Sequence, residues 1–370
     1  MIKYLGSKRV LVPRILELVE GLEGVRTVLD LFSGTTRVAH ALKRRGHRVH
    51  ANDHNAYAAT LAACYVKADK RRWRARAERL CAELDALPGK PGWFTETFCV
   101  RARYLQPPNG ARVDAIRERI AALALEPTLE AIALTSLMEA ADRVDSTTGV
   151  QMAYLKRWAG RSHQPLRLRV PELLNGAGGA SCLDAAEAAS RFEADLAYLD
   201  PPYNQHSYLG NYHLWESLVR WDKPEVYGVA MKRTDVRERG SRFNRKGTID
   251  EALRAVVEAV RARWLVVSFS NEGFLTPERV EAILAVRGPV TRLEIPYRRY
   301  VGARIGIYNP QGEKVGTPGR LTNRELLFMV RVEGRAATRK RHVKAGSRAR
   351  NGSRRAAPVS NPARPLPIER

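Results

Sequence analysis

The residues of this sequence best suited to chemistry are Asp200, Pro201, Pro202 and Tyr203, which directly follow the apolar run Leu196–Leu199. The two prolines fix the backbone and make the turn rigid. The Asp200 carboxylate and the Pro201 carbonyl are two hydrogen-bond acceptors, and Tyr203 adds a flat ring. Two acceptors aimed together suit an exocyclic amine, and the ring suits the face of a base. The pattern indicates a ligand site at a strand end, where open α/β sheets bind ligands.

A second candidate site is the turn after the apolar run Thr27–Leu31. The turn contains Gly34, so backbone N–H groups can approach a ligand closely. Asp53 ends the next strand-like run 19 residues after Gly34, near the ~20-residue offset at which a carboxylate meets a ribose hydroxyl. Because the turn is not G-x-G-x-x-G, the pattern disfavours NAD and favours an adenosine ligand without phosphates. An ordinary turn with an incidental acid stays an alternative.

The elements that must position these residues follow from hydrophobic periodicity. Residues 10–20 have apolar side chains at helical spacing. The runs 27–32 and 48–53 are typical of strands, and helical spacing between them begins at Val38 and ends at Gly46. This strand, glycine turn, helix and strand form the opening unit of a doubly wound parallel sheet.

A long stretch from about Tyr65 to Val170 has helical spacing, many arginines and no strand alternation. Strand-like runs return at 196–200, 264–269, 292–295 and 326–332. The sequence therefore predicts one α/β domain with a helical insertion of roughly one hundred residues. We place the α/β domain at 1–64 and 175–334 and the insertion at 65–174.

The charge of the chain is strongly positive. Its 370 residues include 63 Lys and Arg against 39 Asp and Glu, a formal net charge of +24. Residues 335–370 hold eleven basic residues and one acid, which gives +10. This segment is rich in small and polar residues and has no apolar periodicity, so it is predicted to be a disordered basic tail. The remaining +14 indicates a polyanionic partner for the folded body.

The composition predicts neither a metal site nor a membrane segment. Cys64, Cys81, Cys99 and Cys182 form no C-x-x-C pair, and the eight histidines form no H-x-x-x-H motif beside a glutamate. We expect the cysteines to be reduced thiols. No run approaches the ~18 apolar residues of a membrane span, and the first residues lack the apolar core of a signal peptide. The protein is therefore expected to be cytoplasmic.

In this combination and order, the chain resembles the DNA adenine-N6 methyltransferases of the Dam-like D12 family. The resemblance covers residues 2 to about 332. Residues 3–8, Lys-Tyr-Leu-Gly-Ser-Lys, match the N-terminal element of the family, and residues 30–36, Asp-Leu-Phe-Ser-Gly-Thr-Thr, match its S-adenosylmethionine loop. Residues 200–203 match the catalytic tetrad. Thr35 departs from the pattern, since many relatives have glycine or another small residue there.

The resemblance implies a Rossmann-like doubly wound methyltransferase sheet and S-adenosylmethionine as the cofactor. In this family Lys8 would reach the cofactor carboxylate, Asp53 would bind the ribose, and Asp184 would lie near the adenine. The implied cofactor-binding residues are Tyr4, Lys8, Asp30, Phe32, Gly34, Thr35, Asp53 and Asp184. The implied catalytic residues are Asp200, Pro201, Pro202 and Tyr203.

The implied reaction is methyl transfer to the N6 amine of an adenine flipped out of double-stranded DNA. We expect a monomer that acts as a solitary methylase or beside a companion restriction endonuclease, with the helical insertion as the target-recognition part. Candidate DNA contacts are Arg101, Arg103, Asn109, Arg112, Arg143, the loop 145–149 and the basic loop 237–246. The alternatives are cytosine-N4 methylation, an RNA adenine target, and a non-catalytic nucleic-acid-binding protein.

Overall fold

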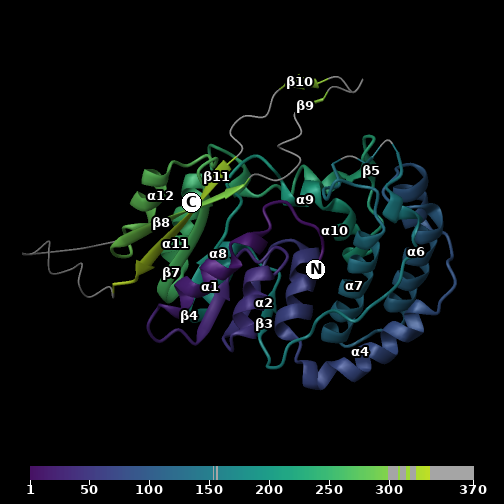
Figure 1. Cartoon of the computed structure of the whole chain (residues 1–370), viewed down its shortest axis with the longest axis horizontal. Coiled ribbons are helices and arrows are strands. Elements are labelled where there is room, and N and C mark those ends of the chain that lie inside the picture. The colour runs from purple at the N-terminus through teal and green to yellow at the C-terminus, as the bar shows by residue number, and fades with distance from the viewer. Residues whose placement is uncertain (153, 156, 299–306, 309–313, 317–321, 334–370) are drawn as a thin grey trace, which may run out of the picture. The chain divides into compact units, whose positions relative to one another are not determined.

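The structure, a computed structural model, describes residues 1–152, 154–155, 157–298, 307–308, 314–316 and 322–333 (Figure 1). The predicted basic tail, residues 335–370, lies outside the described residues. Met1–Val332 form one compact unit. No helix in the described part of the chain is both long and apolar enough to cross a membrane.

A seven-stranded, mostly parallel sheet forms the centre of this unit, in the strand order β3-β2-β1-β4-β7-β11-β8. β11 pairs antiparallel with both β7 and β8, and the other described pairings in this sheet are parallel. The strands are β1 (Thr27–Asp30), β2 (Arg48–Asn52), β3 (Gly179–Ser181), β4 (Glu193–Leu199), β7 (Arg261–Ser270), β8 (Val290–Arg298) and β11 (Thr322–Arg331). The predicted α/β fold with a doubly wound sheet is confirmed.

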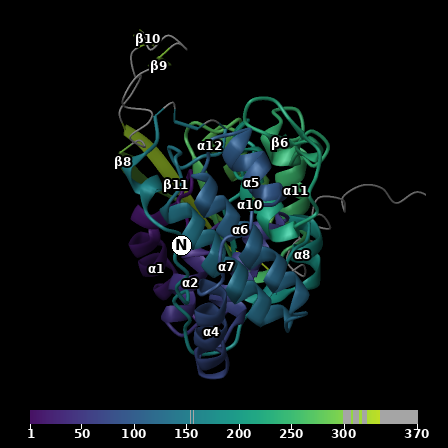
Figure 2. The same cartoon turned by 90° about the vertical axis from the view of Figure 1, so that its right-hand side faces the viewer.

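Helices cover both faces of the sheet because side chains alternate along each strand. On β1, for example, Val28 belongs to one buried apolar cluster and Leu29 to the other. The first face is covered by α1 (Val12–Glu20), α2 (Arg37–Arg44) and α3 (Ala56–Ala62). The second face is covered by α8 (Ala185–Arg191), α11 (Ile249–Ala259) and α12 (Pro277–Leu284). Figure 2 shows α1 and α2 on one side and α8 and α11 on the other.

Described residues between β2 and β3 form helices and loops, as the sequence predicts. After α3, the α-helices of this part are α4 (Lys70–Asp85), α5 (Trp93–Thr95), α6 (Pro107–Ala122) and α7 (Pro127–Arg143), with short π-helical turns at Ala63–Lys67 and Glu96–Val100. Their buried side chains, such as Ile116 and Ile132, belong to the same apolar cluster as Val28 of the sheet. The insertion therefore shares its core with the sheet, and its role as a separate recognition part stays a prediction.

Further helices and strands lie after β4. Two short helices, α9 (Tyr208–Asn211) and α10 (His213–Arg220), follow the Asp-Pro-Pro-Tyr turn. Two small antiparallel ribbons, which the sequence did not predict, pair β5 (Val226–Tyr227) with β6 (Lys232–Arg233), and β9 (Ile307–Tyr308) with β10 (Lys314–Gly316).

Candidate active site

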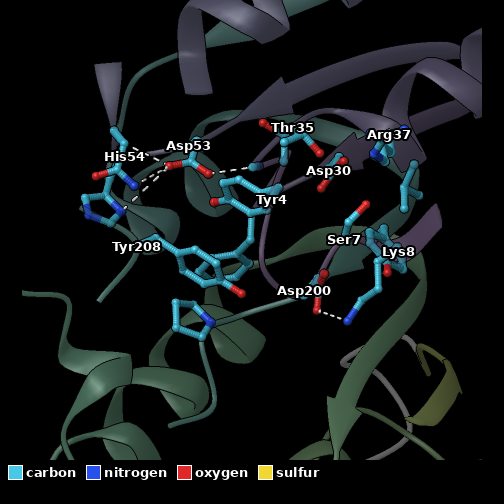
Figure 3. Close-up of a pocket in the computed structure, with 18 of the residues that line it drawn as sticks. Tyr4, Ser7, Lys8, Asp30, Thr35, Arg37, Asp53, His54, Asp200 and Tyr208 are labelled. Atoms are coloured by element: carbon cyan, nitrogen blue, oxygen red, sulfur yellow. Dashed lines mark hydrogen bonds and ion pairs between the residues drawn. The ribbon is translucent and has the colours of Figure 1, made fainter. Parts of the chain in front are cut away.

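A cavity lies at the carboxyl ends of the neighbouring strands β1, β2 and β4, next to the N-terminal residues 4–8 (Figure 3). Parallel strands bring these ends to one edge of the sheet, so residues far apart in the sequence meet there. The cavity is lined by Tyr4, Gly6, Ser7, Lys8, Asp30, Phe32, Ser33, Gly34, Thr35, Arg37, Val38, Asp53, His54, Asn55, Tyr198, Asp200, Pro202, Tyr208 and Ser241. The structure thus brings nine of the predicted site residues together around one cavity. They are Tyr4, Lys8, Asp30, Phe32, Gly34, Thr35, Asp53, Asp200 and Pro202.

The turn after β1 is shaped by backbone conformations that few residues adopt. Gly34 has φ +49°, and a Cβ there would lie 3.3 Å from the ring of Tyr4, so both conformation and space favour glycine. Thr36, the residue before α2, has φ +61°, a left-handed conformation that is strained for a β-branched residue. Thr35 is buried and lines the cavity. The turn is held in place by Asp53, whose carboxylate accepts a 3.0 Å hydrogen bond from the Gly34 amide.

Three tyrosines form an aromatic wall beside this turn. The ring of Tyr4 is stacked on Tyr208 with centroids 5.1 Å apart and on Tyr212 with centroids 4.5 Å apart. Gly6, with φ +71°, lets the chain pass close to this wall, because a Cβ there would lie 2.9 Å from the Tyr208 hydroxyl. Sequence reasoning placed Tyr4 in the site but assigned no role to Tyr212. The signal in the sequence that could have identified Tyr212 is its position four residues after another tyrosine, Tyr208.

Lys8 lies at one end of the cavity, and Figure 3 shows its ammonium group beside Asp200. Its ammonium group is 2.8 Å from Asp200 Oδ1 and 2.6 Å from Glu325 Oε1. Burial alone would lower the pKa of Lys8, but Asp200 and Glu325 outweigh burial and hold this pKa well above its usual value. The Lys8 ammonium, predicted to reach a cofactor carboxylate, already contacts two protein carboxylates.

Glu325 is a buried residue of the site that sequence reasoning missed. It is 1% exposed and lies on β11, where it also accepts a hydrogen bond from the Ser268 hydroxyl. A lone acid at the start of the apolar run 326–330 is the signal that could have identified it.

Unpartnered buried polar groups gather in this cavity. Among the described residues, ten side-chain N or O atoms are buried with no hydrogen-bond partner, and six of them belong to residues that line this cavity. These atoms are on Ser7, Asp30, Ser33, Arg37, Asn55 and Tyr198. Because such groups are costly without partners, the cavity is built to take a polar ligand.

Asp30 and Arg37 offer such a ligand an acidic and a basic partner. Burial and the neighbouring Asp200 raise the pKa of Asp30 well above its usual range, so an ammonium group nearby would stabilise its ionised form. Burial and the nearby Arg9 lower the pKa of Arg37, and a carboxylate beside it would have the reverse effect.

A second, more apolar cavity adjoins the first and shares Phe32, His54 and Ser241 with it. Its walls include Leu183 and Phe243, whose ring meets Phe32 edge-on at 5.1 Å. Asp184 lines this second cavity and not the first. Its carboxylate accepts a hydrogen bond of 2.8 Å from the Ala186 amide at the start of α8. The two cavities together therefore suit a ligand in which a flat ring system is joined to a polar group.

Two residues of the tetrad lie outside the lining of the first cavity. Pro201 is buried, and Tyr203 packs against Phe269 with ring centroids 5.8 Å apart. The Tyr203 carbonyl accepts a 2.8 Å hydrogen bond from the Phe274 amide, which holds the turn. Their catalytic roles stay predictions.

Two candidate DNA contacts in the insertion, Asn109 and Arg112, form hydrogen bonds within the fold. Asn109 is buried and accepts a 2.8 Å hydrogen bond from the Leu166 amide. Arg112 donates to the Leu87 carbonyl and to Asp85. These side chains connect neighbouring segments of the insertion, and their direct contact with DNA stays a prediction.

The basic loop 237–246 has residues that line a cavity as well as exposed basic residues such as Arg242, Arg245 and Lys246, and its contact with DNA stays a prediction. Ser241, Arg242 and Phe243 line the second cavity, and Arg239 pairs with the buried Glu216 at 2.8 Å. At least this part of the loop closes the cavity.

The four cysteines are free thiols, of which Cys182 is exposed. No three His, Cys, Asp or Glu residues in the described ranges gather as a metal site.

Comparison with known proteins decides the family. A family model described as D12 class N6 adenine-specific DNA methyltransferase matches residues 4–281. The chain belongs to this family. The match includes the Gly34 turn, Asp53 and the Asp200 tetrad, and it ends before Glu325. The resemblance stated from the sequence is therefore confirmed.

Relatives of this D12-class chain are modification methylases. The modification methylase StsI of Streptococcus sanguinis is 28% identical over 324 residues, covering 82% of this chain and 49% of that protein. The type II methyltransferase M.FokI of Planomicrobium okeanokoites is 29% identical, covering 80% of this chain and 49% of that protein. This chain thus spans about half the length of these two relatives. The type II methyltransferase M.NlaIII of Neisseria lactamica is 28% identical, covering 73% of this chain and 83% of that protein.

Proposed function

We propose that this protein transfers a methyl group from S-adenosylmethionine to the N6 amine of an adenine in double-stranded DNA, at a specific sequence. The observation that carries the proposal is the Asp200 carboxylate, which follows β4 directly and faces a cavity lined with unpartnered polar groups. Membership of the D12 class supports both the reaction and the target atom.

The two adjoining cavities fit the parts of S-adenosylmethionine. The free Oδ1 of Asp30 suits the ammonium group of the methionine part, and Arg37 suits its carboxylate. Asp53 has lone pairs left for ribose hydroxyls after its bonds to Gly34 and Asn55. The cavity beside Phe32 and Phe243 suits the adenine ring, with Asp184 at its edge.

S-adenosylmethionine, when bound, supplies an electrophilic methyl group on a sulfonium. The protein has to make the adenine amine a better acceptor of that group, because the amine's lone pair is delocalised into the ring. Asp200 and the Pro201 carbonyl would accept hydrogen bonds from the amine, which localises the lone pair and stabilises the positive charge that develops on the nitrogen. Tyr203 would stack on the base and hold it in place.

The target base must leave the duplex to reach this site. The basic body of the protein, at +14 outside the segment 335–370, supports binding to DNA phosphates. We further propose that the protein acts as a monomer in the cytoplasm. The names of the relatives support a place in a restriction-modification system, with a companion endonuclease as the partner.

The test is incubation with radiolabelled S-adenosylmethionine and plasmid DNA, followed by digestion to nucleosides. Label in N6-methyladenine is the expected result. Label in N4-methylcytosine, or label only when RNA replaces DNA, would assign a different target to the same fold. DNA binding with no transfer to either nucleic acid would instead indicate a non-catalytic binding protein.

A further inference from the structure

Glu325 and Lys8 are 317 residues apart in the sequence and form a buried ion pair, in which Lys8 also contacts Asp200. β11 lies between β7 and β8, and the pairing of Glu325 with Ser270 of β7 carries Glu325 to the same sheet edge as Asp200. Lys8 is 7% exposed and Glu325 1%, so bulk water screens neither charge well. Lys8 therefore pairs with both carboxylates and links Glu325 to Asp200.

We propose that Glu325 is a positioning residue for methyl transfer, which acts through Lys8 to orient the Asp200 carboxylate and to keep the cluster of three side chains negatively charged. This inference rests on the function proposed above.

The charge balance explains why two carboxylates are needed. With Lys8 and Asp200 alone, the cluster would be neutral, and the ammonium group would draw electron density from the carboxylate that must accept from the adenine amine. With Glu325 ionised as well, the three groups carry a net charge of −1. A negative cluster stabilises the positive charge that develops on the adenine nitrogen, and its effect is large because the site is buried.

Other ionisable groups also surround Asp200. Asp30 on β1, Tyr198 on β4, Tyr203 of the turn and Tyr208 on α9 all lie close enough to interact electrostatically with Asp200 or Lys8. Burial raises the pKa of Asp200 to about 6, with Lys8 acting against this rise and Glu325 adding to it. Removing Glu325 or Lys8 should therefore move this pKa in opposite directions.

The experiment compares Glu325→Gln and Lys8→Met with the wild type. The Gln side chain still accepts hydrogen bonds from Lys8 and Ser268, so this variant removes charge while it retains packing. We measure kcat, S-adenosylmethionine affinity, and kcat/KM for DNA from pH 5 to pH 9. For Glu325→Gln we expect about a 10- to 100-fold fall in kcat, unchanged cofactor affinity, and an acid limb of kcat/KM at lower pH.

Lys8→Met should move the acid limb to higher pH, because two buried carboxylates then face each other without a cation. Glu325→Asp should recover part of the lost rate. The matched control is Glu294→Gln, which removes an exposed carboxylate of the neighbouring strand β8 that pairs with Arg324. It should leave both the rate and the pH profile unchanged.

Should Glu325→Gln unfold more easily than the wild type yet keep its kcat and pH profile, Glu325 would have a structural role only and the inference would be overturned. A shift of the acid limb of kcat/KM in the same direction in Glu325→Gln and Lys8→Met would also overturn the inference. If the wild type transfers no methyl group to adenine, the proposed function itself fails. An active wild type with an unaffected Glu325→Gln variant removes this inference alone.

Discussion

The backbone amide of Gly34 donates a 3.0 Å hydrogen bond to the carboxylate of Asp53, which lies nineteen residues later in the chain. The same carboxylate accepts hydrogen bonds of 3.0 and 3.1 Å from the amide and side chain of Asn55. Asp53 thus ties the turn after β1 to the turn after β2. A carboxylate has about four lone-pair sites, so Asp53 can hold the turn and accept from a ligand at the same time.

Asp53→Ala should weaken S-adenosylmethionine binding by about 1.5–3 kcal/mol, because it removes a charge-assisted hydrogen bond and frees the Gly34 turn. Isothermal titration calorimetry measures the affinity. Asp53→Asn is the control, since one amide oxygen can still hold Gly34, and it should lose less. An unchanged affinity in the Ala variant would contradict the assignment of this cavity to the cofactor.

Asp200→Ala should lower kcat at least about 100-fold while cofactor affinity stays within a factor of about three, because Asp200 faces the acceptor amine. The variant should fold, since Lys8 keeps Glu325 as its partner at 2.6 Å. Single-turnover transfer of labelled methyl groups and calorimetric cofactor affinity are the two measurements. Transfer within threefold of the wild type would remove Asp200 from the catalytic site.

Arg37→Ala should weaken S-adenosylmethionine binding about tenfold or more, because Arg37 lines the cavity and suits the methionine carboxylate. Methylthioadenosine lacks that carboxylate, so its affinity should not change. Arg44→Ala is the control, because Arg44 lies at the other end of α2 and pairs with the exposed Glu172. Equal losses for both ligands would show that Arg37 supports the fold of the turn and does not bind the carboxylate.

Asp114→Ala should destabilise the protein by about 3 kcal/mol. The buried Asp114 carboxylate accepts from the amides of Gly92, Phe94 and Thr95 at 2.8–2.9 Å, and its loss would leave these donors unpaired. Urea unfolding measures the free energy. Glu118→Ala on the same helix removes a half-exposed ion pair with Lys223 and should change stability by less than about 1 kcal/mol. Similar losses in the two variants would show that pairing these three amides is not what Asp114 contributes to stability.

Deletion of residues 335–370, which carry +10, should weaken DNA binding at low salt and reduce the dependence of affinity on salt. The methylated sequence should stay the same, because base recognition needs side chains held rigidly against base edges. Mapping of methylated sites for both proteins, with affinities at two salt concentrations, measures these effects. A changed recognition sequence would show that this segment reads DNA.

The sequence by itself determined the residues at the centre of the site. Asp30 ends β1, and Asp53 and Asp200 directly follow β2 and β4. Apolar runs bounded by turns and helices are local patterns, and the strand-helix-strand order predicts a parallel sheet. Once the strands are parallel, their carboxyl ends must share an edge. For this reason the three acids could be placed together before any contact was known.

Only the tertiary structure decided which side chains meet one another. Glu325 reaches Lys8 because β11 enters the sheet antiparallel between β7 and β8, and no local pattern predicts a pair 317 residues apart. Asn109 and Arg112 have the composition of DNA contacts, yet their partners are carbonyls, amides and acids of neighbouring segments. A polar side chain looks the same in sequence whether it faces solvent or satisfies a buried group. Burial and partners, which only the packing of distant segments sets, distinguish the two.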